Sequence, residues 1–154
     1  MEIEGLLERA AIAPRVTAGD KRQVFAVIGE IASRSYGLKP STVVNALMRR
    51  ELQGSTGVGY GVATPHARLR GLDRIRGVFV RLETPLDFGS LDEQPVDLLF
   101  ALLAPVDSAA AHLQALAKVS RLMRSAELRR QLRAAHSHDA IHALLVREIR
   151  HDAA

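Results

Sequence analysis

The chain has 154 residues, of which 47% are hydrophobic and 25% are charged, and it contains no cysteine. This composition is typical of a soluble globular domain and excludes disulfide frameworks, thiolate metal sites and cysteine nucleophiles. Aromatic residues make up only 4% of the chain and Trp is absent, which argues against a stacking platform for single-stranded nucleic acid. The formal net charge of +4 suits an acidic protein partner, a phosphate or a nucleic acid, but an ordinary arginine-rich surface gives the same value.

The sequence carries no signal for secretion or membrane insertion. Acidic residues occupy the first positions, where a signal peptide has basic ones, and no apolar h-region follows them. The longest apolar run, residues 98–105, is too short to span a bilayer. We therefore expect a single soluble, cytoplasmic domain over residues 1–154.

Two helices are predicted in the first third of the chain, after a weak signal for a short helix or turn over residues 1–10. Asp20 and Gln23 have the spacing of a capping box, and Gly37 has the position of a C-terminal cap. The second helix is expected to begin at Pro40 and to end near Glu51. Apolar residues at helical intervals support both helices: Val24, Phe25, Ile28, Ile31 and Ala32 in the first, and Val43, Val44, Leu47 and Met48 in the second.

Two strands follow. Residues 75–82 alternate between apolar and other side chains, and residues 96–104 form a nearly continuous apolar run, which indicates a central strand buried on both faces. A turn is predicted between them from its composition, at Thr84, Pro85, Asp87 and Gly89.

Serines at positions 108, 125 and 137 each precede a helical pattern, and the last of these helices is expected to end near Arg150. In the first, residues 109–124, the side chains expected to face the core are Leu113, Leu116, Ala117 and Leu122, with Val119 less well aligned. Helices that alternate with a few strands indicate an α/β fold of the α+β sandwich kind, in which helices pack on a mixed sheet.

Residues 54–69 form the most distinctive stretch. Four glycines occur within eight positions and are followed by Pro65 and His66. Glycine permits positive φ angles and close approach to the backbone, whereas proline stiffens the chain. This stretch is therefore predicted to present His66, whose neutral imidazole is a good nucleophile near neutral pH.

A loop histidine can be a nucleophile, a general base or a metal ligand. The serine-hydrolase motif G-x-S-x-G and the zinc motif H-E-x-x-H are both absent. His138 and His142 are four residues apart but lack an identifiable third ligand, so no metal is expected. The glycine spacing matches neither a Walker A loop nor a dinucleotide fingerprint, so no nucleotide is expected either.

Phosphoryl transfer fits these residues better, because such a site mainly has to position hydrogen-bond donors around the phosphoryl oxygens. Arg50 could supply a guanidinium, and neutral His112, early in a helix, could donate to a phosphoryl group on His66. The alternative for His112 is an ordinary surface position. The predicted phosphoryl-binding loop consists of Ser55, Thr56, Gly57, Gly59 and Gly61, and the remaining histidines, His136, His138, His142 and His151, are expected on the surface.

Residues 50–66 read RELQGSTGVGYGVATPH. This run resembles the R-E-x-x-G-S-T-G-x-G-x-G-x-A-x-P-H signature of the IIA proteins of the bacterial phosphotransferase system. More narrowly, it resembles the nitrogen-regulatory branch of the fructose/mannitol superfamily, and residues 77–88, 92–105, 112–123 and 128–137 agree. The resemblance implies a mixed sheet flanked by helices and a phosphotransferase that needs no metal or organic cofactor. It also implies that His66 is the phosphorylated histidine, His112 the second active-site histidine and Arg50 the active-site arginine.

The partner implied by the resemblance is an HPr-like carrier (NPr) that is charged by a phosphoenolpyruvate-dependent Enzyme I. Thr64 and Ala67 depart from the Ile and Gly usual in the family, which motivates the alternative of a binding module without phosphoryl turnover. A sugar-transport IIA protein, which passes its phosphoryl group to a IIB domain, is the other alternative. No IIB region follows the match, so we expect the regulatory branch, with targets in nitrogen, potassium or stress control and no nucleic-acid partner.

Overall fold

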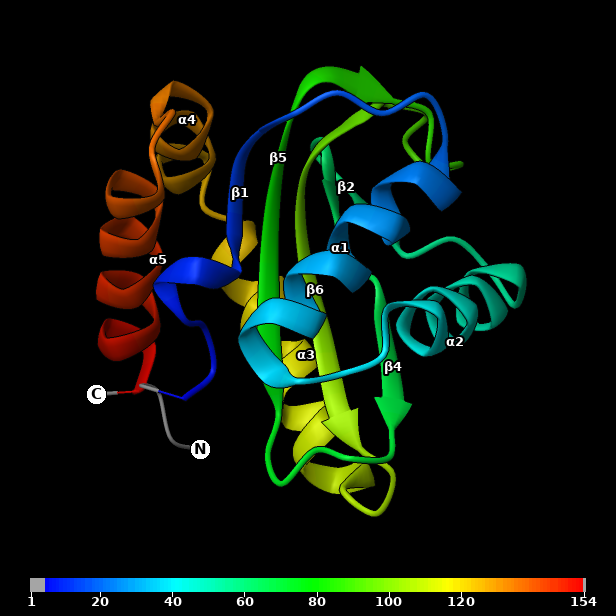
Figure 1. Cartoon of the computed structure of the whole chain (residues 1–154). Coiled ribbons are helices and arrows are strands. Elements are labelled where there is room, and N and C mark those ends of the chain that lie inside the picture. The colour runs from blue at the N-terminus through cyan, green and yellow to red at the C-terminus, as the bar shows by residue number, and fades with distance from the viewer. Residues whose placement is uncertain (1–4, 154) are drawn as a thin grey trace.

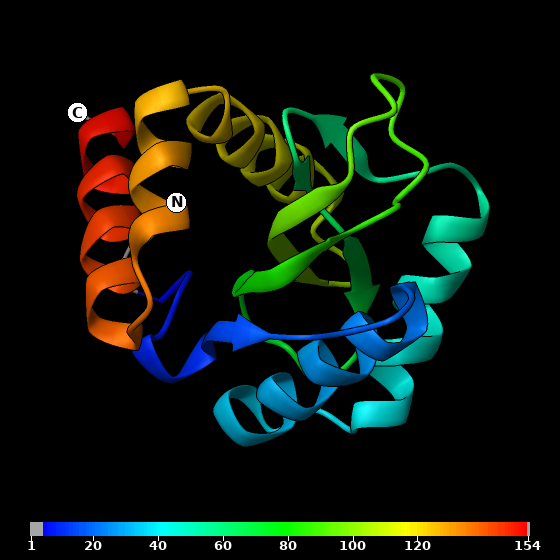
Figure 2. The same ribbon diagram turned by 90° about the horizontal axis from the view of Figure 1, so that it is seen from above.

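The computed structural model describes residues 5–153 and consists of a six-stranded mixed sheet with helices on both faces (Figure 1). The strands are β1 (Ile12–Val16), β2 (Gly57–Gly59), β3 (Val62–Ala63), β4 (His66–Leu69), β5 (Arg76–Leu86) and β6 (Val96–Pro105). The helices are α1 (Lys21–Tyr36), α2 (Pro40–Leu52), α3 (Ala109–Met123), α4 (Ala126–Ala134) and α5 (His138–Ala153), preceded by a 3-10 turn, η1 (Arg9–Ala11). Figure 2 shows α1 and α2 on one side of the sheet and α3, α4 and α5 on the other, which confirms the expected sandwich.

Strand β6 is the centre of the sheet. It pairs with β5 in the antiparallel sense and with β3 and β4 in the parallel sense, in the order β1-β5-β6-β3-β2 with β4 also on β6. Nearly all of its side chains are buried, as its continuous apolar run predicts. Strands β3 and β4 follow one another along the same edge of β6, so that Val62 lies opposite Leu98 and His66 opposite Leu102. His66 is thereby anchored to a long strand that is almost entirely buried.

The predicted helix ends are confirmed where capping residues marked them. The Asp20 carboxylate accepts a hydrogen bond from the Gln23 backbone N–H (2.8 Å), and Gly37 adopts the left-handed conformation with φ of 72°. Ser125 and Ser137 also accept capping hydrogen bonds. Ser108 occupies the N-cap position of α3, but its side chain makes no capping bond.

Strand β5 extends further than the sequence indicated. Thr84 and Pro85 were expected in a turn, but both belong to the strand, which continues to Leu86. The pairing register with β6 is interrupted between Arg81 and Leu86. Pro85 falls within this interruption, where its missing N–H leaves no ladder hydrogen bond unmade.

Helix α3 is rotated relative to the expected orientation. Leu113 was expected to face the core but is 68% exposed, and Ala117 is also exposed, whereas Val119 is buried. The buried face of α3 instead includes His112 and Ala115. A histidine takes a core-facing position that an apolar pattern cannot indicate, and Leu113 is left beside a surface cleft.

Four strands were not predicted, namely β1, β2, β3 and β4. Strand β1 contains Pro14, which weakens a strand pattern, and it pairs in parallel with β5. The glycine-rich stretch was expected to be a loop, but β2 and β3 form a small antiparallel hairpin within it, followed by β4. The weak helical signal over residues 1–10 corresponds in part to η1, while residues 1–4 lie outside the described residues.

Within residues 5–153, no helix is both long enough and apolar enough to cross a membrane.

Candidate active site

His66 and His112 meet in a cleft of about 760 Å³ between the end of α2, strand β4 and the start of α3. Their ring centroids are 5.3 Å apart and the ring planes meet edge to face at 76°. Three arginines, Arg49, Arg50 and Arg68, also line this cleft. The two histidines, which are 46 residues apart in sequence, meet because β4 runs beside β6 and α3 turns back from the end of β6.

The two ring nitrogens of His66 have different partners. Nε of Arg50 lies 3.2 Å from His66 Nε2, and Nδ1 of His66 lies 2.9 Å from the carbonyl oxygen of Thr64. A guanidinium only donates hydrogen bonds and a carbonyl only accepts them. The neutral ring must therefore carry its proton on Nδ1, and Nε2 holds the lone pair that faces the cleft.

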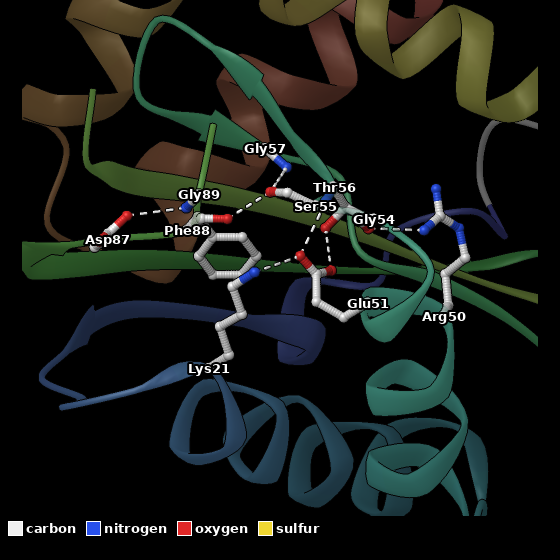
Figure 3. A network of polar contacts seen from close by, with 10 residues as sticks. All are labelled: Lys21, Arg50, Glu51, Gly54, Ser55, Thr56, Gly57, Asp87, Phe88 and Gly89. Atoms are coloured by element: carbon white, nitrogen blue, oxygen red, sulfur yellow. Dashed lines mark hydrogen bonds and ion pairs between the residues drawn. The ribbon is translucent and has the colours of Figure 1, made fainter. Parts of the chain in front are cut away.

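Arg50 is held at the C-terminal end of α2, where a cation complements the helix dipole. Its Nη1 group donates to the carbonyl oxygen of Gly54 (2.9 Å), a contact drawn in Figure 3. Its Nη2 group makes no hydrogen bond to any residue that the structure describes. The side chain is thus fixed against His66 while N–H groups remain available for an anion.

Burial lowers the pKa of both histidines. For His66 desolvation lowers the pKa most, the Thr64 carbonyl opposes this shift, and the charge of Arg50 adds to it. For His112 burial and then the neighbouring charges of His66 and Arg68 lower the pKa to about 4. Both rings are therefore neutral at pH 7, which leaves Nε2 of His66 free to act as a nucleophile.

Nε2 of His112 is buried and lacks a hydrogen-bond partner among the described residues. The side chain as a whole is also buried. A buried polar atom without a partner costs about 1–3 kcal/mol. A ligand group beside His66 that can exchange a hydrogen bond with this ring would remove that cost.

The cleft is positively charged. Arg49, Arg50 and Arg68 line it, and no Asp or Glu from residues 5–153 does so. Arg49 and Arg68 are exposed and make no ion pair with another described residue. This arrangement favours an anionic ligand between the two histidines.

The glycine-rich stretch lies beside the cleft rather than in it. The Ser55 hydroxyl donates to the Phe88 carbonyl oxygen and accepts from the Gly57 N–H (3.0 Å), while the buried Thr56 hydroxyl donates to Glu51 (2.6 Å; Figure 3). None of the expected loop residues, Ser55, Thr56, Gly57, Gly59 and Gly61, lines the cleft. The Ser55 and Thr56 hydroxyls and the Gly57 N–H thus already have partners within the protein.

Two glycines in this stretch have a packing reason. A Cβ atom at Gly57 would collide with the Ser90 hydroxyl, and a Cβ at Gly61 would collide with the Arg133 guanidinium. Gly61 also has φ of 78°, which strains any other residue. These glycines permit the hairpin to pack closely against Ser90 and Arg133.

The remaining histidines are not part of the cleft. His136, His138 and His151 are exposed as expected, whereas His142 is half-buried with its Nε2 3.2 Å from the Leu7 carbonyl oxygen. No group of three or more His, Asp or Glu side chains in residues 5–153 is arranged to hold a metal ion.

Sequence reasoning missed the Thr64 carbonyl, which fixes the His66 proton, and the pairing of Glu51 with Lys21. A backbone acceptor has no residue-type signal at all. The pair is separated by 30 residues along the chain, so that only the packing of α1 on α2 brings its members together.

Residues 5–148 match the family model described as "Phosphoenolpyruvate-dependent sugar phosphotransferase system, EIIA 2". The chain belongs to this EIIA family. It is 42% identical to a "Nitrogen regulatory protein" from Bradyrhizobium diazoefficiens, over 94% of this chain and 95% of that protein. It is 40% identical to a "Nitrogen regulatory protein" from Escherichia coli K12, over 94% of this chain and 90% of that protein.

A solved structure gives the same result. The nitrogen regulatory protein IIA-Ntr from Neisseria meningitidis superimposes with a TM-score of 0.85 at 33% identity, and the match covers 91% of this chain and 96% of that chain. The resemblance to the nitrogen-regulatory branch is thus confirmed in sequence and in fold. As an EIIA protein, the chain is a phosphotransfer component of IIA type.

Proposed function

We propose that this protein is a phosphocarrier in which Nε2 of His66 accepts a phosphoryl group from the phosphohistidine of an HPr-like carrier of the NPr type. That carrier is charged by a phosphoenolpyruvate-dependent Enzyme I. Residues 1–154 act as one EIIA domain in this proposal. The observation that carries it is the pair of hydrogen bonds on His66, which leave the proton on Nδ1 and the lone pair on Nε2.

The transfer is a single displacement. The Nε2 lone pair of His66 forms a bond to phosphorus while the nitrogen–phosphorus bond of the carrier breaks, and its electron pair returns to the carrier's imidazole. The His66 ring gains positive charge, and the Thr64 carbonyl stabilises it through the Nδ1–H hydrogen bond. Little covalent chemistry is left to the protein beyond positioning and charge stabilisation.

Arg50 and His112 act on the transferred group. Arg50 releases Nε2 as phosphorus approaches and donates its N–H groups to the phosphoryl oxygens, for which its Nη2 group is available. His112, neutral and 5.3 Å from His66 between ring centroids, completes its missing hydrogen bond with the same group. Ser55, Thr56 and the glycines support the residues around the cleft instead of touching the phosphoryl group.

The output that we propose is regulatory. A phosphoryl group adds about −1.5 to −2 charges, by analogy with phosphoserine, to a cleft lined by Arg49, Arg50 and Arg68. Target proteins that bind this surface would then distinguish the two states by charge, without a change of fold. The names of the relatives, nitrogen regulatory proteins, support a regulatory role over the alternative of sugar transport through a IIB domain. The targets that we propose lie in nitrogen, potassium or stress control.

Intact-mass spectrometry tests the proposal. The protein is incubated with phosphoenolpyruvate, Enzyme I and the carrier, beside the variants His66→Ala and His112→Ala and the matched control His136→Ala at an exposed position. One acid-labile phosphoryl adduct is expected on the wild type and on the control, with none on His66→Ala and slower formation on His112→Ala. If the wild type forms no adduct with a carrier that is shown to be active, the proposal is wrong. The protein is then the alternative, a binding module without phosphoryl turnover.

A further inference from the structure

A network of polar contacts connects α1, α2 and the glycine-rich stretch (Figure 3). The Glu51 side chain is only 4% exposed and accepts three hydrogen bonds. The donors are Nζ of Lys21 (2.8 Å), the backbone N–H of Thr56 (2.9 Å) and the Thr56 hydroxyl (2.6 Å). Glu51, Lys21 and Thr56 are all absent from the lining of the cleft.

The position of Glu51 is unfavourable for a carboxylate considered alone. It lies in the last turn of α2, where the helix dipole opposes a negative charge, and it is buried. A buried ion pair stabilises a fold no better, as a rule, than apolar side chains of the same volume. Stability alone therefore gives little reason for this network. Its connections to the residues of the cleft suggest a functional reason.

One connection leads to His66. The carbonyl oxygen of Thr56 accepts a hydrogen bond from the Thr64 N–H (2.9 Å). The carbonyl oxygen of the same Thr64 lies 2.9 Å from Nδ1 of His66. The residue that Glu51 holds thus sets the position of the acceptor that keeps the His66 proton on Nδ1.

The other connection leads to Arg50. Glu51 closes the short segment from its own position to Thr56, and Gly54 lies within that segment. The Gly54 carbonyl oxygen accepts from Arg50 Nη1, which holds the guanidinium against His66 Nε2. Lys21, 4.6 Å from the centre of the Phe88 ring, neutralises Glu51 and ties the segment to the start of α1.

We propose that Glu51, supported by Lys21 and acting through Thr56, is a positioning group that holds His66 in its Nδ1–H tautomer and Arg50 against Nε2. The inference rests on the proposed function for its kinetic consequence, but not for its structural one. Glu51 does not line the cleft, so it acts on the reacting groups through Thr56 and Gly54 and through its charge, which opposes the lowering of the His66 pKa by burial.

Two pairs of variants test this role. Thr56→Val replaces the hydroxyl by a methyl group, whereas Thr56→Ser keeps the hydroxyl. Glu51→Gln removes the charge, and its matched control Glu30→Gln makes the same change at an exposed position of α1. Each variant is measured by ¹⁵N NMR of the His66 ring, by thermal unfolding, and by the kcat and KM for phosphorylation by the carrier.

Thr56→Val and Glu51→Gln are expected to move the His66 nitrogen shifts away from the pure Nδ1–H pattern. They are also expected to lower kcat about tenfold, through imperfect orientation of the reacting groups, while KM for the carrier stays unchanged. Thr56→Ser and Glu30→Gln should match the wild type in all three measurements. If Glu51→Gln does not fold, Thr56→Val decides alone, because valine has nearly the shape of threonine.

Nitrogen shifts in Thr56→Val that equal those of the wild type, whatever the melting temperature, would overturn the inference and leave a purely structural network. The proposed function fails in a different way. If the wild type accepts no phosphoryl group, the kinetic comparison is lost, but the ¹⁵N shifts still decide whether Glu51 and Thr56 set the tautomer of His66.

Discussion

The guanidinium of Arg50 donates from Nε to Nε2 of His66, at 3.2 Å, so a cation covers the lone pair that we propose to be phosphorylated. Burial lowers the pKa of His66 most, and the charge of Arg50 adds to this lowering, so the ring stays neutral. When a phosphoryl group arrives, the guanidinium must exchange this nitrogen for the phosphoryl oxygens. Arg50 therefore prepares the nucleophile first and stabilises the transferred charge afterwards.

Replacement of Arg50 tests both effects. Arg50→Ala is expected to slow phosphorylation about a hundredfold, because a charged donor to the transferred group is lost, and to raise the pKa of His66, because a nearby positive charge is removed. Stopped-flow phosphorylation and an NMR titration of His66 measure the two quantities. Arg49→Ala, an exposed neighbour on the same helix, is the control and should act mainly through salt-dependent association. Equal effects of the two substitutions would contradict the role of Arg50.

The lowered pKa of His112 should make the stability of the protein depend on pH. Its pKa is about 4 in the folded protein and near its ordinary value of 6.5 in the unfolded chain, so the unfolded chain binds the extra proton between these values. The contribution to stability is complete above pH 6.5 and is lost as the pH falls toward 4. The free energy of unfolding of the wild type, relative to His112→Gln, should fall by roughly 2 to 3 kcal/mol between pH 7 and pH 4. Urea denaturation at a series of pH values measures this difference, and a constant difference would argue against a buried neutral ring.

Gly57 should act through packing and not through phosphoryl binding. In Gly57→Ala the new methyl group collides with the Ser90 side chain, which is expected to cost about 1–3 kcal/mol of unfolding free energy. The double variant Gly57→Ala with Ser90→Gly removes that side chain and should recover part of the loss. Phosphorylation of the folded Gly57→Ala protein should stay close to that of the wild type. A large loss of phosphorylation without a loss of stability would instead return Gly57 to the phosphoryl-binding loop of the sequence prediction.

Most of the fold could be predicted because its elements carry local signals. Asp20 and Gly37 mark the two ends of α1 by capping chemistry, and the apolar run of β6 marks a strand buried on both faces. The register of α3 could not be predicted, because His112 occupies the core-facing position and Leu113 does not. Nor could β1, a short strand that contains Pro14 and pairs with β5.

The candidate site divides in the same way. His66, His112 and Arg50 were named from the sequence, and the structure brings all three to one cleft. The hydroxyls of Ser55 and Thr56 were expected there because the motif places them near His66 in sequence. In the structure, the Phe88 carbonyl oxygen and the Glu51 carboxylate accept these hydroxyl protons, and the contact with Phe88 is one that sequence spacing does not indicate.

The most direct test of the central proposal is the atom that carries the phosphoryl group. The protein, labelled with ¹⁵N in its histidine rings, is phosphorylated by the carrier and studied by ³¹P and ¹⁵N NMR. We predict a one-bond coupling between phosphorus and Nε2 of His66. Nδ1 should still be protonated and should donate a hydrogen bond to the carbonyl oxygen of Thr64. A coupling to Nδ1 of His66, or a phosphoryl group on any other residue, would contradict the assignment of the nucleophile.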